Sequence, residues 1–267
     1  MSHDFVNLDW PGRPLRLEIA WVGPAAPAAP VIVFLHEGLG SVAMWKDFPE
    51  RLCHAVGARG LVFSRYGYGR STPKPADERW PVSFMHAQAF EVLPRLFERL
   101  GVSRPCLFGH SDGGSIALLH ASRFPTAAVV SVAAHIFTED FGIRSIEAAR
   151  TAYESTDLRA KLSRYHADVD SAFRGWNDVW LDPAFRAWNI EAELDTIACP
   201  LLVVQGVDDE YGTMAQVHGI ARHVPHAQVL AMPGCGHSPH RDQPDALIAA
   251  TGAFMQRAGL VATQNEH

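Results

Sequence analysis

The stretch that decides the fold is Gly109–Gly114, which reads GHSDGG. The apolar run at 105–108 predicts a short strand before it, and small and apolar residues at 112–123 predict a helix after it. A serine on such a sharp turn has a strained backbone and a projecting hydroxyl, and side chains in place of the flanking glycines would collide with neighbouring elements. Ser111 is therefore a candidate nucleophile in a G-x-S-x-G pattern, although a serine that merely caps a helix would give the same pattern.

The same alternation of apolar runs and helical segments extends on both sides of this turn. Residues 5–22 are typical of an antiparallel hairpin, and residues 23–30 form a Pro/Ala linker. Further strands are expected at 31–35, 60–64, 105–108, 127–132, 200–205 and 228–232, and helices at 45–57, 86–100, 112–123 and 243–257. We therefore expect an α/β fold, with a mostly parallel eight-stranded sheet that carries helices on both faces.

Residues 138–198 interrupt this rhythm. They contain no convincing strand, hold three tryptophans and are too long for a plain connection. We expect an inserted helical cap at 138–198 on a core built from residues 1–137 and 199–267, with a frayed tail at 258–267.

The composition excludes several classes of protein. The chain has 267 residues, of which 48% are hydrophobic, and this is enough for one well-filled core. A formal net charge of −6 without basic clusters argues against nucleic-acid and membrane-surface binding. No segment has the pattern of a signal peptide or a bilayer span, and the four cysteines form no CxxC pair. These features predict a cytoplasmic protein with reduced thiols and leave a homodimer open.

Candidates for a catalytic acid and base follow two later strands. A serine hydroxyl needs a base to activate it, and that base needs an acid to orient it. Asp208 and Asp209 follow the strand at 200–205, and His237 follows the strand at 228–232. Ser111 and these residues all lie just beyond the carboxyl ends of parallel strands, where α/β sheets place their sites.

Five landmarks in this order resemble the α/β-hydrolase fold over nearly the whole chain. Residues 36–40, HEGLG, resemble the oxyanion loop of that family, and residues 66–71, YGYGRS, resemble its G-x-G-x-S turn. The stretch 109–114 resembles its nucleophile turn. Residues 206–209 match the acid position, where the spacing favours Asp209 over Asp208, and residues 236–237 match the base.

The resemblance implies a role for each matching residue. Ser111 would be the nucleophile, His237 the general base and Asp209 the orienting acid. The backbone N–H of Asp112 would be one donor of the oxyanion hole, and the N–H of Gly38 is the favoured second donor.

Two residues depart from the family pattern. Glu37 stands where the family usually has glycine, which leaves the second oxyanion donor open by one residue. Arg65 stands near a position where the family often has aspartate, and a structural ion pair is the plainest interpretation.

Two acidic side chains are expected beside the reacting centre. The carboxylates of Glu37 and Asp112 would repel an anionic substrate unless cations compensate, and the arginines available for this in the cap are Arg144, Arg174 and Arg186. We therefore expect a neutral or cationic ester, and in one form of this hypothesis Asp112 receives a substrate ammonium group.

Other residues are expected to support the site. His36 and His110 are interpreted as hydrogen-bonded structural histidines near it, and Trp176 and Trp180 as pocket residues. Glu37 and His110 are also candidate substrate-binding residues. A metal site built from His237, His240 and Asp242 is conceivable, but a surface position for His240 is favoured, and we expect neither a metal nor a cofactor.

The resulting prediction is a serine hydrolase that cleaves a small carboxylic ester. A C–C bond hydrolase acting on a ring-cleavage product, or a lactonase, would use the same residues. Because the fold also hosts binding proteins without catalytic activity, a receptor-like ligand-binding protein is the alternative outside enzymes.

Overall fold

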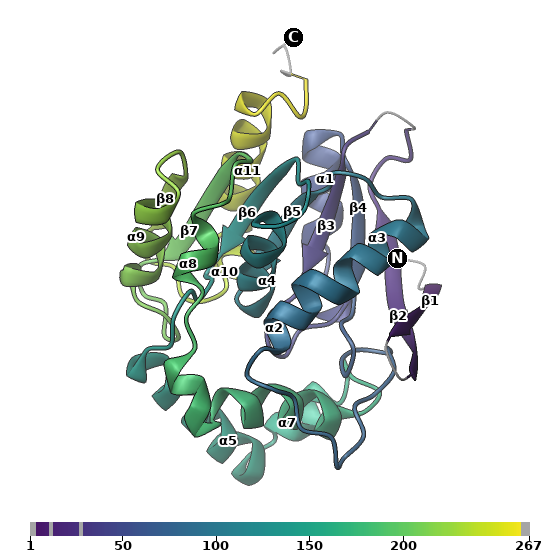
Figure 1. The fold of residues 1–267 in the computed structure, drawn as a ribbon, viewed down its shortest axis with the longest axis vertical. Helices are drawn as coiled ribbons and strands as arrows, with labels where there is room; N and C mark the ends of the chain where they lie inside the picture. Colours follow the sequence, from purple (N-terminus) through teal and green to yellow (C-terminus); the bar gives the residue numbers. More distant parts are fainter. Residues whose placement is uncertain (1–3, 11–12, 27–28, 263–267) are drawn as a thin grey trace.

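Figure 1 shows the computed structural model, which describes residues 4–10, 13–26 and 29–262. The strands are β1 (Asp4–Trp10), β2 (Arg13–Val22), β3 (Val31–Leu35), β4 (Arg59–Phe63), β5 (Cys106–His110), β6 (Ala128–Val132), β7 (Leu201–Gly206) and β8 (Gln228–Met232). In the described part of the chain they form one eight-stranded sheet in the order β1-β2-β4-β3-β5-β6-β7-β8. The pairs β1–β2 and β2–β4 are antiparallel, and the others are parallel. The expected mostly parallel sheet is confirmed.

The central strands are apolar throughout because both of their faces are buried. In β3, Val33 and Leu35 belong to one core layer, whereas Ile32 and Phe34 belong to the layer on the opposite face. Side chains alternate between the faces of a strand, so in a strand that is covered on both sides every side chain is buried and apolar residues are favoured at every position. This explains the continuous apolar runs of the sequence.

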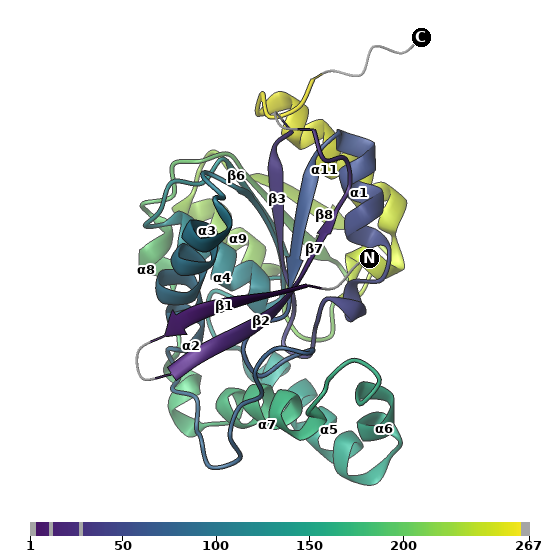
Figure 2. The same cartoon turned by 90° about the vertical axis from the view of Figure 1, so that its right-hand side faces the viewer.

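Helices cover the two faces of the sheet unequally (Figure 2). On one face, α1 (Phe48–Val56) packs against α11 (Pro244–Arg257). The other face carries five helices of the described chain: α2 (Phe84–Ala87), α3 (Leu93–Leu100), α4 (Asp112–Ala121), α8 (Glu191–Leu194) and α9 (Met214–His223). Helices on both faces were expected.

Two of the four expected helices are interrupted, whereas those expected at 112–123 and 243–257 are found at Asp112–Ala121 and Pro244–Arg257. The helix expected at 45–57 is split into a 3-10 turn at Ala43–Trp45 and α1, because Lys46 turns the chain at a φ of 55°. The helix expected at 86–100 starts at Phe84 and contains a π-helical turn at Gln88–Val92 between α2 and α3. The last helix starts at Pro244, after the short helix α10 (Pro239–Asp242).

Residues 138–198 are helical within the described chain. They form α5 (Asp140–Ser155), α6 (Leu158–Leu162), α7 (Val169–Trp180), a 3-10 turn at Pro183–Ala187 and α8, with one isolated bridge between Phe137 and Asn189. Helices α5, α6 and α7 lie together at one end of the sheet (Figures 1 and 2). They cover the end at which β5 leads into α4.

Two further expectations bear on the fold. None of the helices in the described ranges is long and apolar enough to cross a membrane. The last part of the expected tail, 263–267, lies outside the described residues.

Candidate active site

Ser111 lies on a strained turn between β5 and α4. Its φ is 54° and its ψ is −121°, a backbone conformation that is costly for a residue with a side chain. A Cβ atom at Gly109 would lie 2.1 Å from the carbonyl oxygen of Gly113, and one at Gly113 would lie 2.0 Å from the carbonyl oxygen of Leu35. The two glycines therefore allow the strand, the turn and the helix to pack closely enough for this turn to form.

Asp209 and His237 contact each other at the ends of β7 and β8. His237 Nδ1 lies 2.9 Å from each carboxylate oxygen of Asp209 and donates to this group. The carboxylate also accepts hydrogen bonds from the N–H of Tyr211 and from Gln205 Nε2, at 2.8 and 2.7 Å. Burial raises the pKa of Asp209, but the hydrogen bond and charge of His237 and the N–H of Tyr211 outweigh burial and lower it. Asp208 is exposed.

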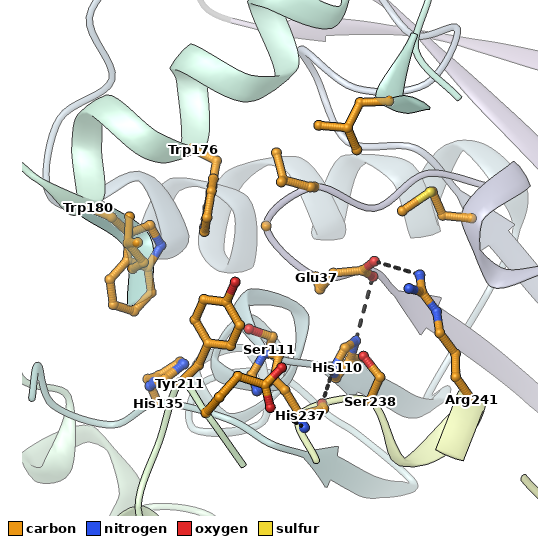
Figure 3. Close-up of a pocket in the computed structure, with 16 residues that line it drawn as sticks. Glu37, His110, Ser111, His135, Trp176, Trp180, Tyr211, His237, Ser238 and Arg241 are labelled. Atoms are coloured by element: carbon orange, nitrogen blue, oxygen red, sulfur yellow. Dashed lines mark hydrogen bonds and ion pairs between the residues drawn. The ribbon is translucent and has the colours of Figure 1, made fainter. Parts of the chain in front are cut away.

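The backbone of His237 is held on both sides. Its N–H donates to Glu210 at 3.1 Å, and its carbonyl oxygen accepts from His110 Nε2 at 2.7 Å. Because Nδ1 carries the proton that bonds to Asp209, Nε2 of a neutral His237 has a free lone pair. His237 and Ser111 line the same pocket (Figure 3).

Two backbone N–H groups near Ser111 are candidates for an oxyanion hole. Asp112 is the first residue of α4, so its N–H has no acceptor within the helix. The N–H of Gly38 has no hydrogen-bond partner among the described residues. A Cβ atom at Gly38 would lie 2.2 Å from the indole ring of Trp176, so the loop passes close under α7.

The carboxylate of Asp112 is turned away from the pocket. Asp112 is fully buried; its Oδ2 lies 3.5 Å from Arg65 Nη2, and its Oδ1 accepts from Trp180 Nε1 at 3.1 Å. Burial raises the pKa of Asp112, while Arg65 and Trp180 oppose that rise. The expectation that Asp112 receives a substrate ammonium group is wrong, because Trp180 of α7 and Arg65 enclose its carboxylate. The plain interpretation of Arg65 as an ion-pair partner is confirmed.

Glu37 is the acidic side chain that does face the pocket (Figure 3). Its Oε2 lies 3.6 Å from His110 Nδ1, and its Oε1 lies 3.4 Å from Arg241 Nη2. Burial raises the pKa of Glu37, but the neighbouring His110, His240 and Arg241 more than compensate and hold it well below the usual range. Glu37 is therefore ionised at neutral pH.

The pocket has a cavity volume of about 250 Å³ and two chemically different parts. Its apolar lining residues are Leu39, Met44, Ile146, Leu162, Trp176 and Trp180, and its polar lining includes Glu37, His110, Glu210, Tyr211, Ser238 and Arg241. Four of the apolar residues come from 138–198, so this segment supplies most of the apolar surface.

The cations expected from the cap do not line this pocket. Arg144, Arg174 and Arg186 are absent from its lining, and Arg186 pairs with Asp140 at the surface. Their place is taken by Arg241 on α10, which the sequence reasoning missed. A signal for it existed, because it lies only four positions after His237.

His240 is buried, so the expectation of a surface position is wrong. It is 4% exposed, and its ring lies 4.9 Å from that of Trp45 and 4.7 Å from that of His110. Burial lowers the pKa of His240 well below its usual range. No group of three or more His, Cys, Asp or Glu side chains in the described ranges is arranged to hold a metal ion.

His135, Glu210 and Tyr211 are pocket residues that sequence reasoning missed. His135 lies just beyond β6, and burial together with the nearby His237 lowers its pKa to about 4. Glu210 and Tyr211 directly follow Asp209. Each of the three follows a parallel strand at the same edge of the sheet, and this position could have identified them.

Comparison with known proteins assigns the chain to a family. The model of the Alpha/beta hydrolase family matches residues 32–250, which is more than half of the chain. The chain therefore belongs to the α/β hydrolase family and is a hydrolase of that family.

Similar proteins act on different substrates. The sn-1-specific diacylglycerol lipase ABHD11 of Mus musculus is 25% identical over 275 residues, covering 91% of this chain and 86% of the lipase. A 2-hydroxy-6-oxo-6-phenylhexa-2,4-dienoate hydrolase of Burkholderia cepacia is 22% identical over 253 residues, covering 84% of this chain and 87% of the relative. The structure of a thermophilic esterase from Thermogutta terrifontis matches with a TM-score of 0.71 and 18% identity, over 97% of this chain and 99% of the esterase.

Proposed function

We propose that the protein is a serine hydrolase that cleaves small carboxylic esters, with Ser111, His237 and Asp209 as its catalytic triad. The observation that carries this proposal is the strained Ser111 in one pocket with a histidine that is hydrogen-bonded to a buried aspartate. A helix-capping serine requires neither a backbone strained in this way nor such a histidine.

In the proposed mechanism, Ser111 Oγ attacks the ester carbonyl and His237 Nε2 takes its proton. The N–H groups of Gly38 and Asp112 stabilise the oxyanion. His237 then gives the proton to the leaving alcohol, and water hydrolyses the acyl-enzyme by the same route. Asp209 fixes the tautomer of His237 and stabilises its charged form.

The two parts of the pocket favour a small neutral ester. Trp176 and Trp180 offer flat apolar surface to one part of the substrate, whereas Glu37 and Arg241 offer hydrogen bonds to the other. Since these two charges lie 3.4 Å apart, they largely balance each other. We further propose that residues 138–198 act as a cap domain on a core of residues 1–137 and 199–267, because this segment supplies Ile146, Leu162 and both tryptophans.

Covalent labelling with a fluorophosphonate tests the proposed nucleophile. The folded wild type should form an adduct at Ser111, and Ser111→Ala should lose both the adduct and about 10⁴-fold or more of its esterase activity. Ser238→Ala is the matched control, because Ser238 lines the same pocket and should leave labelling intact. A folded wild type without an adduct would instead favour a ligand-binding protein.

A C–C bond hydrolase is the second candidate, supported by the similarity to the dienoate hydrolase. A panel of short-chain aryl esters, a lactone and a ring-cleavage dienoate, each with Ser111→Ala as control, separates these activities. We expect the highest kcat/KM for a neutral aryl ester, and a higher value for the dienoate would reverse the assignment.

A further inference from the structure

Arg65, two residues after the end of β4, is a buried cation with fixed partners. Its side chain is 1% exposed, and its Nη2 lies 2.9 Å from the carbonyl oxygen of Glu37 and 3.5 Å from Asp112 Oδ2. The guanidinium carbon lies 4.7 Å from the centre of the Tyr68 ring. Arg65 is not among the residues that line the pocket around Ser111, so it has no direct access to a substrate there.

One of these contacts acts on the peptide group that contains the N–H of Gly38. The carbonyl oxygen of Glu37 and the N–H of Gly38 belong to the same peptide bond. This oxygen accepts from Arg65 Nη2 and, at 2.7 Å, from His36 Nδ1. Hydrogen bonds to a carbonyl fix the peptide plane and polarise it, which strengthens its N–H as a donor.

The tautomer of His36 follows from the same network. His36 Nε2 accepts the backbone N–H of Arg65 at 2.9 Å, so Nδ1 must carry the hydrogen that bonds to Glu37. Arg65 therefore acts on the Glu37–Gly38 peptide twice, directly through its guanidinium and indirectly through its backbone and His36.

Another contact of the guanidinium is with Asp112, whose backbone N–H is the other candidate donor of the oxyanion hole. Asp112 Oδ2 faces Arg65, and Asp112 Oδ1 is held by Trp180 of α7. These two contacts fix the side chain at the first position of α4, and the N–H of the same residue is the proposed donor.

We propose that Arg65 is a positioning residue that sets both N–H donors of the oxyanion hole through one guanidinium. This inference rests on the proposed function, because it assumes that an oxyanion forms beside Gly38 and Asp112. It assigns a role to Arg65, one of the two residues at which the chain departs from the family pattern.

The main comparison of the test is made between two variants in which residue 112 is already neutral. Arg65→Met alone would leave Asp112 without its partner, so the informative comparison is Arg65→Met/Asp112→Asn against Asp112→Asn. Arg65→Lys keeps the charge but cannot reproduce the shape of the guanidinium. Arg13→Met is the matched control, because Arg13 also pairs with a carboxylate, Glu78, but has no contact with Ser111 or the oxyanion loop.

The readout is the binding of a trifluoromethyl ketone, which adds Ser111 Oγ to its carbonyl and places an oxyanion in the hole. The matched methyl ketone reports ground-state binding. We expect the inhibition constant of the trifluoromethyl ketone to rise, and kcat to fall, by about ten- to hundredfold in the double variant relative to Asp112→Asn. KM and methyl ketone binding should change by less than about twofold. Arg65→Lys should recover part of the loss, and Arg13→Met should show none.

Two results would overturn the inference, and they are distinguishable. If trifluoromethyl ketone binding in the double variant and in Arg65→Lys matches that in their reference proteins while only the melting temperature falls, Arg65 is merely structural. If the wild type itself forms no adduct at Ser111, the proposed function fails and the inference fails with it.

Discussion

Two carboxylates beside Ser111 lie in opposite environments: Asp112 on the covered side, under α7, and Glu37 on the open side, which faces the pocket. On the covered side, Asp112 is fully buried and contacts Arg65 and Trp180. On the open side, the side chain of Glu37 is 15% exposed and pairs with Arg241, which is 45% exposed. Burial raises the pKa of Asp112, whereas His110 and Arg241 help to lower that of Glu37 in spite of burial. Two residues of equal charge beside one serine therefore have different physical consequences.

This difference shows that proximity to Ser111, the proposed nucleophile, does not by itself place a carboxylate where it can contact a substrate. A buried carboxylate that is paired with an arginine gives up its hydration for the pair, and the balance is often unfavourable to stability. Asp112 orders the covered side and cannot reach a ligand, so of these two carboxylates only Glu37 can respond to the charge of a substrate.

The largest effect is expected from the close packing of the covered side. In Gly113→Ala the new Cβ would lie 2.0 Å from a backbone oxygen of β3, so strand and helix must separate. We expect a loss of about 3 kcal/mol in the free energy of unfolding and about a hundredfold loss of esterase activity, because Ser111 moves. Urea unfolding and steady-state kinetics measure both.

Gly252→Ala in α11 is the control for that substitution. Its Cβ would meet only Val56, at 3.4 Å, and alanine favours a helix more than glycine does. Wild-type activity in Gly113→Ala would show that β3 and α4 can separate without displacing Ser111. The covered side would then not be the more rigid of the two sides.

The second prediction compares the two carboxylates directly. At pH 7, Glu37→Gln should lower the free energy of unfolding by about 1–2 kcal/mol, because it removes hydrogen bonds to a charged group. Asp112→Asn should lower it by about 2–3 kcal/mol, because Arg65 then lies buried without its carboxylate partner. A smaller loss for Asp112→Asn than for Glu37→Gln in urea unfolding would mean that the cost of burying the Arg65–Asp112 pair cancels its attraction.

The sheet and the order of the site residues could be predicted from the sequence because they depend on local pattern. Strands buried on both faces leave continuous apolar runs, and the family landmarks follow those strands in chain order. Ser111, Asp209 and His237 follow the ends of β5, β7 and β8. The proximity of Asp209 and His237 could therefore be predicted without knowing the orientation of any side chain.

The direction of individual side chains could not be predicted, because distant segments decide it. The carboxylate of Asp112 forms an ion pair with Arg65, from the loop after β4, and accepts a hydrogen bond from Trp180 of α7. His240 is polar but packs on Trp45, which is nearly 200 residues earlier in the chain. No local pattern around Asp112 or His240 contains this information.

The third prediction follows the two carboxylates with pH. The pKa of Glu37 is lower in the folded than in the unfolded protein, so its stabilising contribution is present above about pH 4.3 and is lost as the pH falls through the folded pKa. The stability difference between the wild type and Glu37→Gln should therefore be constant near neutrality and shrink on acidification.

For Asp112 the stability difference between the wild type and the variant should change with pH in the opposite direction. Its folded pKa is raised, so the wild type should gain stability relative to Asp112→Asn as the pH falls through that pKa. Urea unfolding of the wild type and both variants from pH 7 to pH 3 measures both trends. Parallel curves for the two variants would contradict the different environments assigned to these residues.

The smallest effect is expected from Arg241, the exposed residue on the open side, and it concerns the preference for substrate charge. Arg241→Met removes the positive partner of Glu37 and leaves the polar part of the pocket more negative. Because Arg241 is half exposed, we expect kcat/KM to fall for an anionic ester and to rise for a cationic ester of matched size by only about two- to fivefold, with smaller changes at high salt. Arg174→Met makes the same change in net charge on α7, away from the pocket lining, and should leave this preference unaltered. Equal changes in kcat/KM for esters of both charges, or the same change in Arg174→Met, would show that the Glu37–Arg241 pair does not sense the charge of the substrate. Glu37 on the open side would then be as indifferent to substrate charge as Asp112 is on the covered side.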